Sequence, residues 1–365
     1  MSTTTTTTTT ETPSEILIPS LPNDVALQCL ARVPRQYHPV LAAVSKPVRS
    51  LLSSPEFFAA RSALNCAEHL LYFRIGILDF RPARWFTLYR RPNPNSAAGN
   101  FTMAPVPGNP NDCLQLYKHA VVGPKIYLLS DEIGHKNTAK VWIFDCRFHT
   151  WERGPNIPTC QKFGLRTVVL DAKIYVFGSL TVKGSWADVF DTVAGRWEAL
   201  PSPELTVYDK LVLGCGVKGG KVCVWVVEGV ELRFDPGTKT WEVNSLALPG
   251  FEQICEVNGV LCCCNGDIRT LKGFDERVGL WKEINLVNGG FPNDFLVLQT
   301  LNVGGRLVIV GLGRMGVWCA EFEVKQDRDN GDFSGEVLWS DMVYLMHKSF
   351  LYRLSLFNTC MPVSL

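Results

Sequence analysis

The residues of this sequence that could bind a metal ion or act as nucleophiles are its thirteen cysteines and six histidines. The cysteines lie between Cys29 and Cys360 without a recurring spacing, which is typical of reduced thiols rather than of a disulfide framework. Cys262, Cys263 and Cys264 form a run, but no C-x2-C pair of the kind found in zinc sites accompanies it. We expect buried core thiols here, and we predict neither a metal site nor a cofactor.

Common catalytic motifs are also missing from the sequence. It has no G-x-S-x-G elbow, no Walker A loop and no H-E-x-x-H, and its histidines show no close ligand pairing: His38, His69, His119, His135, His149 and His347. We therefore predict no catalytic residue and a protein that is not an enzyme.

The overall charge and hydropathy narrow the class of partner. A formal net charge of +1 provides no long-range field toward nucleic acid or anionic lipid, so we expect neither as a partner. No apolar run approaches the roughly 20 residues needed to cross a bilayer, and the N-terminus lacks the order of a secretory signal. These features predict a protein of the cytoplasm, the nucleus or both.

The N-terminal part divides into a tail and a helical segment. Residues 1–18 contain an unbroken threonine tract from Thr3 to Thr10 with no apolar face, which predicts a disordered tail. Residues 19–63 predict a small all-α domain of three short helices. In the first helix, Asn23 or Asp24 is expected to cap the first turn, and Pro34 prevents the helix from continuing.

The second and third helices also have start and stop signals. The second is expected to begin near His38 and to be limited by Pro47, and the third to begin with Ser54 as its cap, followed by proline and glutamate. A unit of about forty-five residues lies at the lower edge of independent stability. We therefore expect a partner protein to cover its apolar face.

A repeat organises the remaining chain. An aspartate precedes a tryptophan by six residues five times, far more often than random placement gives: Asp79/Trp85, Asp145/Trp151, Asp191/Trp197, Asp235/Trp241 and Asp275/Trp281. Four of these aspartates directly follow a phenylalanine, as expected where an apolar strand enters a turn. The tryptophan is then expected to begin the next strand and to fill the gap between neighbouring sheets. Trp339 is expected to mark a sixth unit, with the aspartate spacing displaced by an insertion at 325–335.

Second apolar runs lie upstream of the Asp/Trp pairs, at 125–128, 173–176, 221–224, 259–262 and 306–309. Each repeat therefore predicts four strands, and the tryptophan spacing suits the blades of an all-β propeller, which we expect to have six blades over residues 66–357. Residues 92–112 are expected to form an extended loop. Because residues 70–90 supply only about two strands, residues 343–357 are expected to complete the first blade and close the ring.

Four segments of the helical region carry a family resemblance: Leu21-Pro22-Asn23-Asp24, Leu30-Ala31-Arg32-Val33-Pro34, Val44-Ser45-Lys46 and Leu51-Leu52-Ser53-Ser54-Pro55. Together they resemble an F-box, in the form seen in plant F-box/kelch-repeat proteins. The resemblance implies a substrate-recognition subunit of an SCF-type E3 ubiquitin ligase. The F-box would bind a Skp-type adaptor, and through it a cullin/RING ligase, while the propeller would bind a target protein whose identity is unknown. Carried over by position, the residues implied in adaptor binding are Leu21, Pro22, Leu27, Leu30, Val33, Pro34, Leu41, Val44 and Val48.

An alternative function remains open at this stage. The propeller could serve as a protein-interaction scaffold that recruits no ligase. In either case the Asp and Trp residues of the repeat are expected to be structural. Substrate contacts are expected instead from loops at one rim, for example residues 131–140 and 183–185, Arg269 and Arg314.

Overall fold

The structure is a computed structural model of the chain. It describes residues 16–76, 83–90, 101–109, 117–130, 140–158, 162–180, 186–203, 212–245, 254–264, 270–289, 291, 296–313, 315–327, 329–345 and 359–365. Contacts divide the chain into two units: residues 1–68 with Leu365, and residues 69–364. The tail predicted over residues 1–18 lies almost entirely outside the described residues.

The first unit is helical. Its described elements are α1 (Asn23–Ala31), the 3-10 helix η1 (Arg35–Tyr37), α2 (His38–Val44), α3 (Lys46–Leu52) and α4 (Pro55–Ala63). The predicted second helix corresponds to α2, and the structure adds a helix that the sequence did not predict, α3, in which Pro47 belongs to the start rather than to the end of a helix. Ser45 is extended, with φ −154° and ψ 160°, and its Oγ accepts a hydrogen bond from the Val48 amide at 3.3 Å. Pro47 lies in the first turn of α3, where a missing N–H costs nothing.

Of the two other predicted N-terminal caps, the structure confirms that of α4 and contradicts that of α1. Ser54 caps α4 as predicted, because its Oγ accepts from the Phe57 amide at 3.2 Å. The predicted cap of α1 is wrong. Asn23 is the first residue of the helix, and its Oδ1 accepts instead from the Leu17 amide at 3.1 Å, before the helix.

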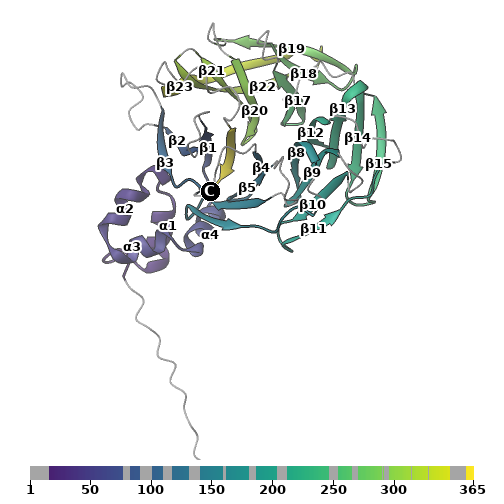
Figure 1. Cartoon of the computed structure of the whole chain (residues 1–365). Helices are drawn as coiled ribbons and strands as arrows, with labels where there is room; N and C mark the ends of the chain where they lie inside the picture. Colours follow the sequence, from purple (N-terminus) through teal and green to yellow (C-terminus); the bar gives the residue numbers. More distant parts are fainter. Residues whose placement is uncertain are drawn as a thin grey trace, which may run out of the picture. The chain divides into compact units, whose positions relative to one another are not determined.

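The second unit consists of antiparallel four-stranded groups, and its described residues form six of them, which we number as blades 1 to 6 in chain order (Figure 1). From the inner to the outer strand they are β24 (Thr359–Ser364), β1 (His69–Ile75), β2 (Arg84–Arg90) and β3 (Phe101–Val106); β4 (Tyr117–Val122), β5 (Lys125–Ser130), β6 (Val141–Asp145) and β7 (Thr150–Arg153); and β8 (Lys162–Leu170), β9 (Lys173–Leu180), β10 (Ala187–Asp191) and β11 (Arg196–Ala199).

Blades 4 to 6 follow the same order: β12 (Val212–Lys218), β13 (Lys221–Val226), β14 (Val230–Asp235) and β15 (Thr240–Ser245), with the 3-10 turn η2 (Val227–Gly229); β16 (Ile254–Val257), β17 (Val260–Cys264), β18 (Leu271–Asp275) and β19 (Leu280–Val287); and β20 (Leu296–Val303), β21 (Arg306–Gly313), β22 (Gly316–Gln326) and β23 (Phe333–Leu345). The second unit is therefore a propeller of four-stranded blades.

The inner strands close the ring. Each inner strand contacts the inner strand of the next blade, in the order β24, β4, β8, β12, β16 and β20. The last of them, β20, contacts β24 again. The first blade is completed by the C-terminus, but not by the segment that the sequence predicted. Residues 343–345 belong to β23, residues 346–358 lie outside the described residues, and the strand that pairs with β1 is β24, with His69 opposite Ser364. The predicted end of the propeller at residue 357 is thus too early.

The first blade differs from the prediction in a second way, because part of the loop predicted at residues 92–112 is a strand. Residues 101–106 form its outer strand, β3, which pairs with β2. Pro105 in this segment had favoured a loop, but an outer strand needs no ladder donor on its open side.

Four of the five predicted Asp/Trp pairs share one geometry. Each aspartate ends a third strand, and each tryptophan is the second residue of a fourth strand. The phenylalanine before the aspartate lies directly opposite the tryptophan: Phe144/Trp151, Phe190/Trp197, Phe234/Trp241 and Phe274/Trp281. The ring centroids of these cross-strand pairs lie 4.6, 4.9, 5.0 and 5.2 Å apart. Such aromatic pairs stabilise neighbouring strands beyond the area that they bury.

The first predicted pair does not belong to the series. Trp85 lies on β2, the third strand of its blade, and not on a fourth strand, while Asp79 lies outside the described residues. The side chain of Trp85 is buried, and its ring centroid lies 5.0 Å from that of Trp151 in the next blade. The six-residue spacing is therefore a coincidence at this position.

Blade 6 departs from the others at the predicted insertion. Asp327 closes a tight turn between β22 and β23, because its Oδ1 accepts from the amides of Asp329 and Asn330. The lengthened β23 then pairs in parallel with β19, with Ile284 opposite Phe333. Trp339 lies on the fourth strand as predicted, but its Nε1 donates to the carboxylate of Glu321. The insertion thus joins blades 5 and 6 into one sheet.

Candidate functional site

The helical unit carries the residues predicted to bind an adaptor, and the structure separates them by exposure. Leu21, Pro22, Pro34 and Val44 are exposed; Leu27, Val33 and Leu41 are half-buried; Leu30 and Val48 are buried. Leu30 and Val48 are only 6% and 3% exposed, so their burial favours a role in holding the helices together. The other seven remain predicted contact residues.

Two exposed apolar strips mark the surface of this unit. On α2, Val40 and Val44 are 68% and 71% exposed, and their four-residue spacing places them on one side of the helix. Leu21, two residues before α1, and Val25, in its first turn, are each 39% exposed. Val25, Tyr37 and Val40 were not among the predicted contact residues, although the four-residue spacing from Val44 could have identified Val40.

A buried arginine holds the corner after α1. The guanidinium of Arg61, on α4, donates from Nη1 to the carbonyls of Ala31 and Val33, both at 2.8 Å. Its Nη2 donates to the Cys66 carbonyl at 2.8 Å and to Glu68 Oε2 at 2.6 Å. Because Arg61 is only 2% exposed, these partners replace the water that its charge would otherwise require. The segment carrying Val33 and Pro34 is thus fixed against α4.

A histidine packs next to this corner. The Nε2 of His38 lies 3.1 Å from the Val33 carbonyl, and its ring meets the ring of Phe57 edge-on, with centroids 5.3 Å apart. Burial lowers the pKa of His38 from 6.5 to about 4, and the nearby charges of Arg35 and Arg61 act in the same direction. The imidazole is therefore neutral at physiological pH.

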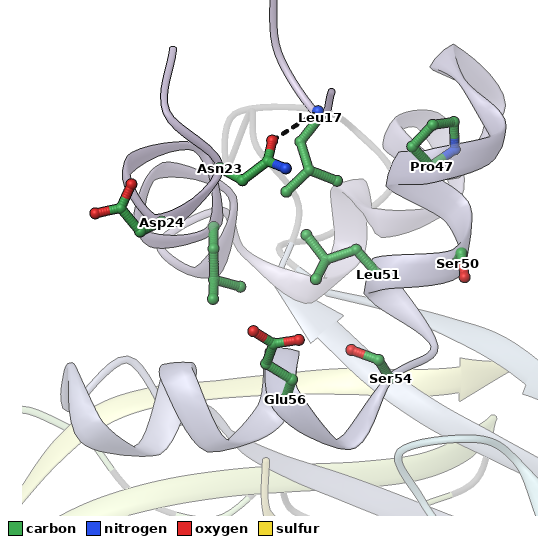
Figure 2. Close-up of a pocket in the computed structure, with 9 residues that line it drawn as sticks. Leu17, Asn23, Asp24, Pro47, Ser50, Leu51, Ser54 and Glu56 are labelled. Carbon is green, nitrogen blue, oxygen red and sulfur yellow. Dashed lines mark hydrogen bonds between the residues drawn. The ribbon is translucent and has the colours of Figure 1, made fainter. Parts of the chain in front are cut away.

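A hollow of about 510 Å³ lies between α1, α3 and the start of α4 (Figure 2). Its lining residues are Leu17, Asn23, Asp24, Leu27, Pro47, Ser50, Leu51, Ser54 and Glu56. Figure 2 shows the side chains of Leu51 and Glu56 pointing into this space, with Asp24 at its outer edge. We call this hollow the α1/α3 groove.

Among the residues that the structure describes, no three His, Cys, Asp or Glu side chains lie close enough together to bind a metal ion. The run Cys262–Cys264 is buried, as the sequence predicted. Burial raises the pKa of each of these thiols to about 12, so they are protonated and poor ligands or nucleophiles. Among the described helices, none combines the length and the apolar character needed to span a membrane.

A hydrogen bond between neighbouring blades repeats around the propeller. The indole Nε1 donates to a proline carbonyl just beyond the outer strand of the preceding blade: Trp151 to Pro107 at 2.9 Å, Trp197 to Pro155 at 3.0 Å and Trp241 to Pro201 at 2.7 Å. Sequence reasoning missed the prolines, although two of them follow their own blade's tryptophan by four residues. These bonds favour a structural role for the three tryptophans.

Trp281, the fourth tryptophan of the series, packs against apolar side chains of two blades. The residue four positions after Trp241 is Ser245, so the preceding blade has no proline at the place that corresponds to Pro155 and Pro201. The side chain of Trp281 is half-buried and packs against an apolar cluster that spans two blades, with Cys223 and Trp225 from blade 4 and Leu261 and Phe274 from blade 5. This packing across two blades agrees with the gap-filling role that the sequence predicted for the repeat tryptophans.

The two rims of the propeller differ in their connections. First and second strands are joined by tight two-residue turns, such as Gly219–Gly220, where φ is 57° and 72°, a conformation that glycine adopts more readily than other residues. Third and fourth strands are joined on the same rim by the aspartate turns, in which the carboxylate accepts from turn amides such as Gly237 N at 2.8 Å. Connections from second to third strands leave from the opposite rim, where the predicted substrate loops belong. Apart from Lys140, those loops lie outside the described residues.

Comparison with known proteins matches both units. A model of the FKB95 kelch-repeats domain matches residues 85–344, and a model of the F-box domain matches residues 18–59. The F-box/kelch-repeat protein At4g39590 of Arabidopsis thaliana is 31% identical, covering 91% of this chain and 89% of its own. This chain belongs to the F-box/kelch-repeat family. The F-box/kelch-repeat protein At4g39560 of the same plant is 36% identical, covering 66% of this chain and 89% of its own.

The two matched ranges of this F-box/kelch-repeat protein cover most of its helices and strands. The F-box match begins before α1 and ends within α4, so it includes both apolar strips and every lining residue of the α1/α3 groove except Leu17. The kelch match begins at Trp85 and ends at Tyr344. The strands β1 and β24, which close the ring, therefore lie outside the matched repeat.

Proposed function

We propose that this protein is the substrate-recognition subunit of an SCF-type ubiquitin ligase, with the helical unit binding a Skp-type adaptor. The observation that carries the proposal is the pair of apolar strips on a unit that matches the F-box. Val40 and Val44 leave about two thirds of their side-chain surface in water, which is unfavourable unless a partner buries it. Adaptor contacts would come from Leu21, Pro22, Leu27, Val33, Pro34, Leu41 and Val44, joined by Val25, Tyr37 and Val40.

In this proposal the buried residues position the contacts rather than make them. Leu30 and Val48 pack the helices together, and Arg61 fixes the corner that carries Val33 and Pro34. The propeller would bind the protein to be ubiquitinated through the rim opposite the tight turns, since loops there can change without disturbing the blades. The chain itself would perform no chemistry. Ubiquitin transfer would be carried out by the cullin/RING ligase that the adaptor recruits.

Capture of the adaptor tests the proposal. The full chain should retain a purified Skp-type adaptor, and the double variant Leu21→Ala with Pro22→Ala should lose it. A matched control is Val193→Ala, which removes a comparably apolar side chain that is 87% exposed in the sheet unit. Equal retention by the wild type and the double variant would refute the assigned contact surface. Recovery of an adaptor without any cullin from cell extract would favour a scaffold that recruits no ligase.

A further inference from the structure

Three of the exposed apolar side chains of the sheet unit lie together at blade 6, on the rim opposite the tight turns. Leu296 begins the inner strand β20 and is 47% exposed, and Leu345 ends the outer strand β23 and is 64% exposed. Met315, also 47% exposed, lies in the turn between β21 and β22. Because Gly316 pairs with Leu345, the chain places Met315 next to the end of β23. The rim of blade 6 thus carries an open apolar surface.

This surface continues into the side of blade 6 that faces its neighbour in the ring, blade 1 (Figure 1). One residue of each strand lies directly opposite the next, so these side chains share one face of the sheet: Leu296, Leu312, Val317 and Tyr344. The last three pack in an apolar cluster that also contains residues of β1 and β2. Tyr344 meets Phe86 of β2, with ring centroids 5.3 Å apart. Since Leu312 and Tyr344 are only half-buried, this cluster is open to water at the rim.

A cation of blade 1 borders the same surface. Arg84 begins β2 directly opposite Ile75, which belongs to the same apolar cluster, so the side chain of Arg84 also faces blade 6. Arg84 is exposed, and it precedes Phe86 by two residues, which places it nearer the rim. Among the described residues of this face at the rim, Arg84 alone carries a charge. The predicted substrate contact Arg314, directly before Met315 in the sequence, lies outside the described residues.

We propose that this surface is the part of the rim that binds the target protein, and that it takes a segment in which apolar side chains flank an aspartate or a glutamate. We call it the blade 6/1 rim patch and define it by Leu296, Leu312, Met315, Tyr344, Leu345 and Arg84. Apolar side chains of the segment pack on the leucines, Met315 and Tyr344, which removes apolar surface from water. The carboxylate pairs with the guanidinium of Arg84. The proposal rests on the proposed role of this rim in substrate binding and specifies the chemistry of the substrate.

The test uses the full chain labelled at leucine, valine and methionine methyl groups and two blocked peptides as probes. N-acetyl-Leu-Glu-Leu-amide should shift the methyl signals of Leu296, Met315 and Leu345 at millimolar concentration, and N-acetyl-Leu-Lys-Leu-amide should bind about five-fold more weakly. Arg84→Gln should weaken binding of the glutamate peptide about two- to five-fold, the range of a solvent-accessible ion pair. Arg90→Gln, at an exposed arginine on the other end of β2, should leave it unchanged.

Two further variants separate the apolar part of the patch from its charge. Leu345→Ser should weaken binding of both peptides about five-fold, because their leucines lose apolar contact. Leu280→Ser is the matched control, at a leucine of β19 that is 62% exposed, and it should change neither affinity. Arg84→Glu should transfer the preference to the lysine peptide, with the same methyl signals shifted.

Several results would overturn the proposal: equal shifts with both peptides in the wild type, shifts confined to other methyl groups, or no shift with either peptide. Methyl NOEs from Leu351 or Leu354 to Met315 in the free protein would assign the patch to the segment that follows Leu345. Patch signals that move with protein concentration would assign it to a second copy, and either assignment would also overturn the proposal. Because no adaptor is present, a failure here leaves the capture test unaffected, whereas a failed capture test with intact peptide binding would refute the ligase role alone.

Discussion

Replacing Arg61 with methionine should open the helical unit while leaving the propeller folded. Methionine retains most of the apolar stem but removes the donors to Ala31, Val33, Cys66 and Glu68. Breaking a buried ion pair by removing one partner costs about 3–5 kcal/mol. Glu68 retains 31% of its side-chain exposure and can be hydrated by water, so we expect the lower value, about 3 kcal/mol. That corresponds to about a hundredfold change in the opening equilibrium.

Hydrogen exchange on the full chain measures this effect. In Arg61→Met, the amides of α1 should exchange about a hundredfold faster, and those of the propeller strands should keep the wild-type rate. Arg49→Met is the matched control, because Arg49 is exposed and its Nε makes a hydrogen bond with the Ala42 carbonyl at 2.9 Å. Unchanged protection of α1 in Arg61→Met would show that Arg61 does not hold the corner after α1.

Three other perturbations have defined outcomes. Gln299→Leu removes both bonds that join the side-chain amide to the Cys360 backbone, each 2.9 Å long, so β24 should lose about 1–3 kcal/mol of protection in hydrogen exchange, and unaltered exchange there would contradict this role in ring closure. Trp197→Phe should lower the stability of the propeller by about 1 kcal/mol in urea unfolding through loss of the bond to Pro155, and a variant as stable as the wild type would rule out a contribution from that bond. The pKa of His38 is about 4 in the folded protein and 6.5 otherwise, so the unfolded chain binds the extra proton first and stability of the helical unit should fall as pH drops from about 6.5 to about 4. Hydrogen exchange in α1 and α4 should show this pH dependence in the wild type and a weaker one in His38→Gln; equal dependence in both would exclude His38 as its source.

Much of the architecture follows from short-range patterns. An Asp/Trp pair six residues apart fits one turn with its two flanking strands, so four of the five pairs predicted blades correctly. The pair Asp79/Trp85 failed because the same spacing also arises between a second and a third strand, which sequence spacing alone does not distinguish. The strand that closes the ring was misplaced for a related reason, because Thr359–Ser364 pairs with residues almost three hundred positions away.

Contacts between blades were harder to predict than the blades themselves. The spacing that identified Trp281 as a member of the repeat describes one turn within blade 5, and it contains no information about the residues of blade 4 that the indole meets. The proline four residues after Trp151 and after Trp197 supplies that information for Trp197 and Trp241.

The candidate site was predictable to a different degree. Apolar positions of the helices were readable from the sequence, but their exposure was not, because Leu30 and Val44 are similar side chains with opposite burial. Arg61 gave no sequence signal, since its partners are backbone carbonyls brought together only by the fold. The α1/α3 groove depends in the same way on how α1, α3 and α4 pack.

Affinity purification of the full chain from plant cell extract, with its partners identified by mass spectrometry, tests the receptor role most directly. The wild type should recover a Skp-type adaptor together with a cullin, and the Leu21→Ala, Pro22→Ala variant should recover neither while still eluting as a folded protein. A wild-type chain that recovers no adaptor and no cullin would contradict the proposed role in ubiquitin transfer.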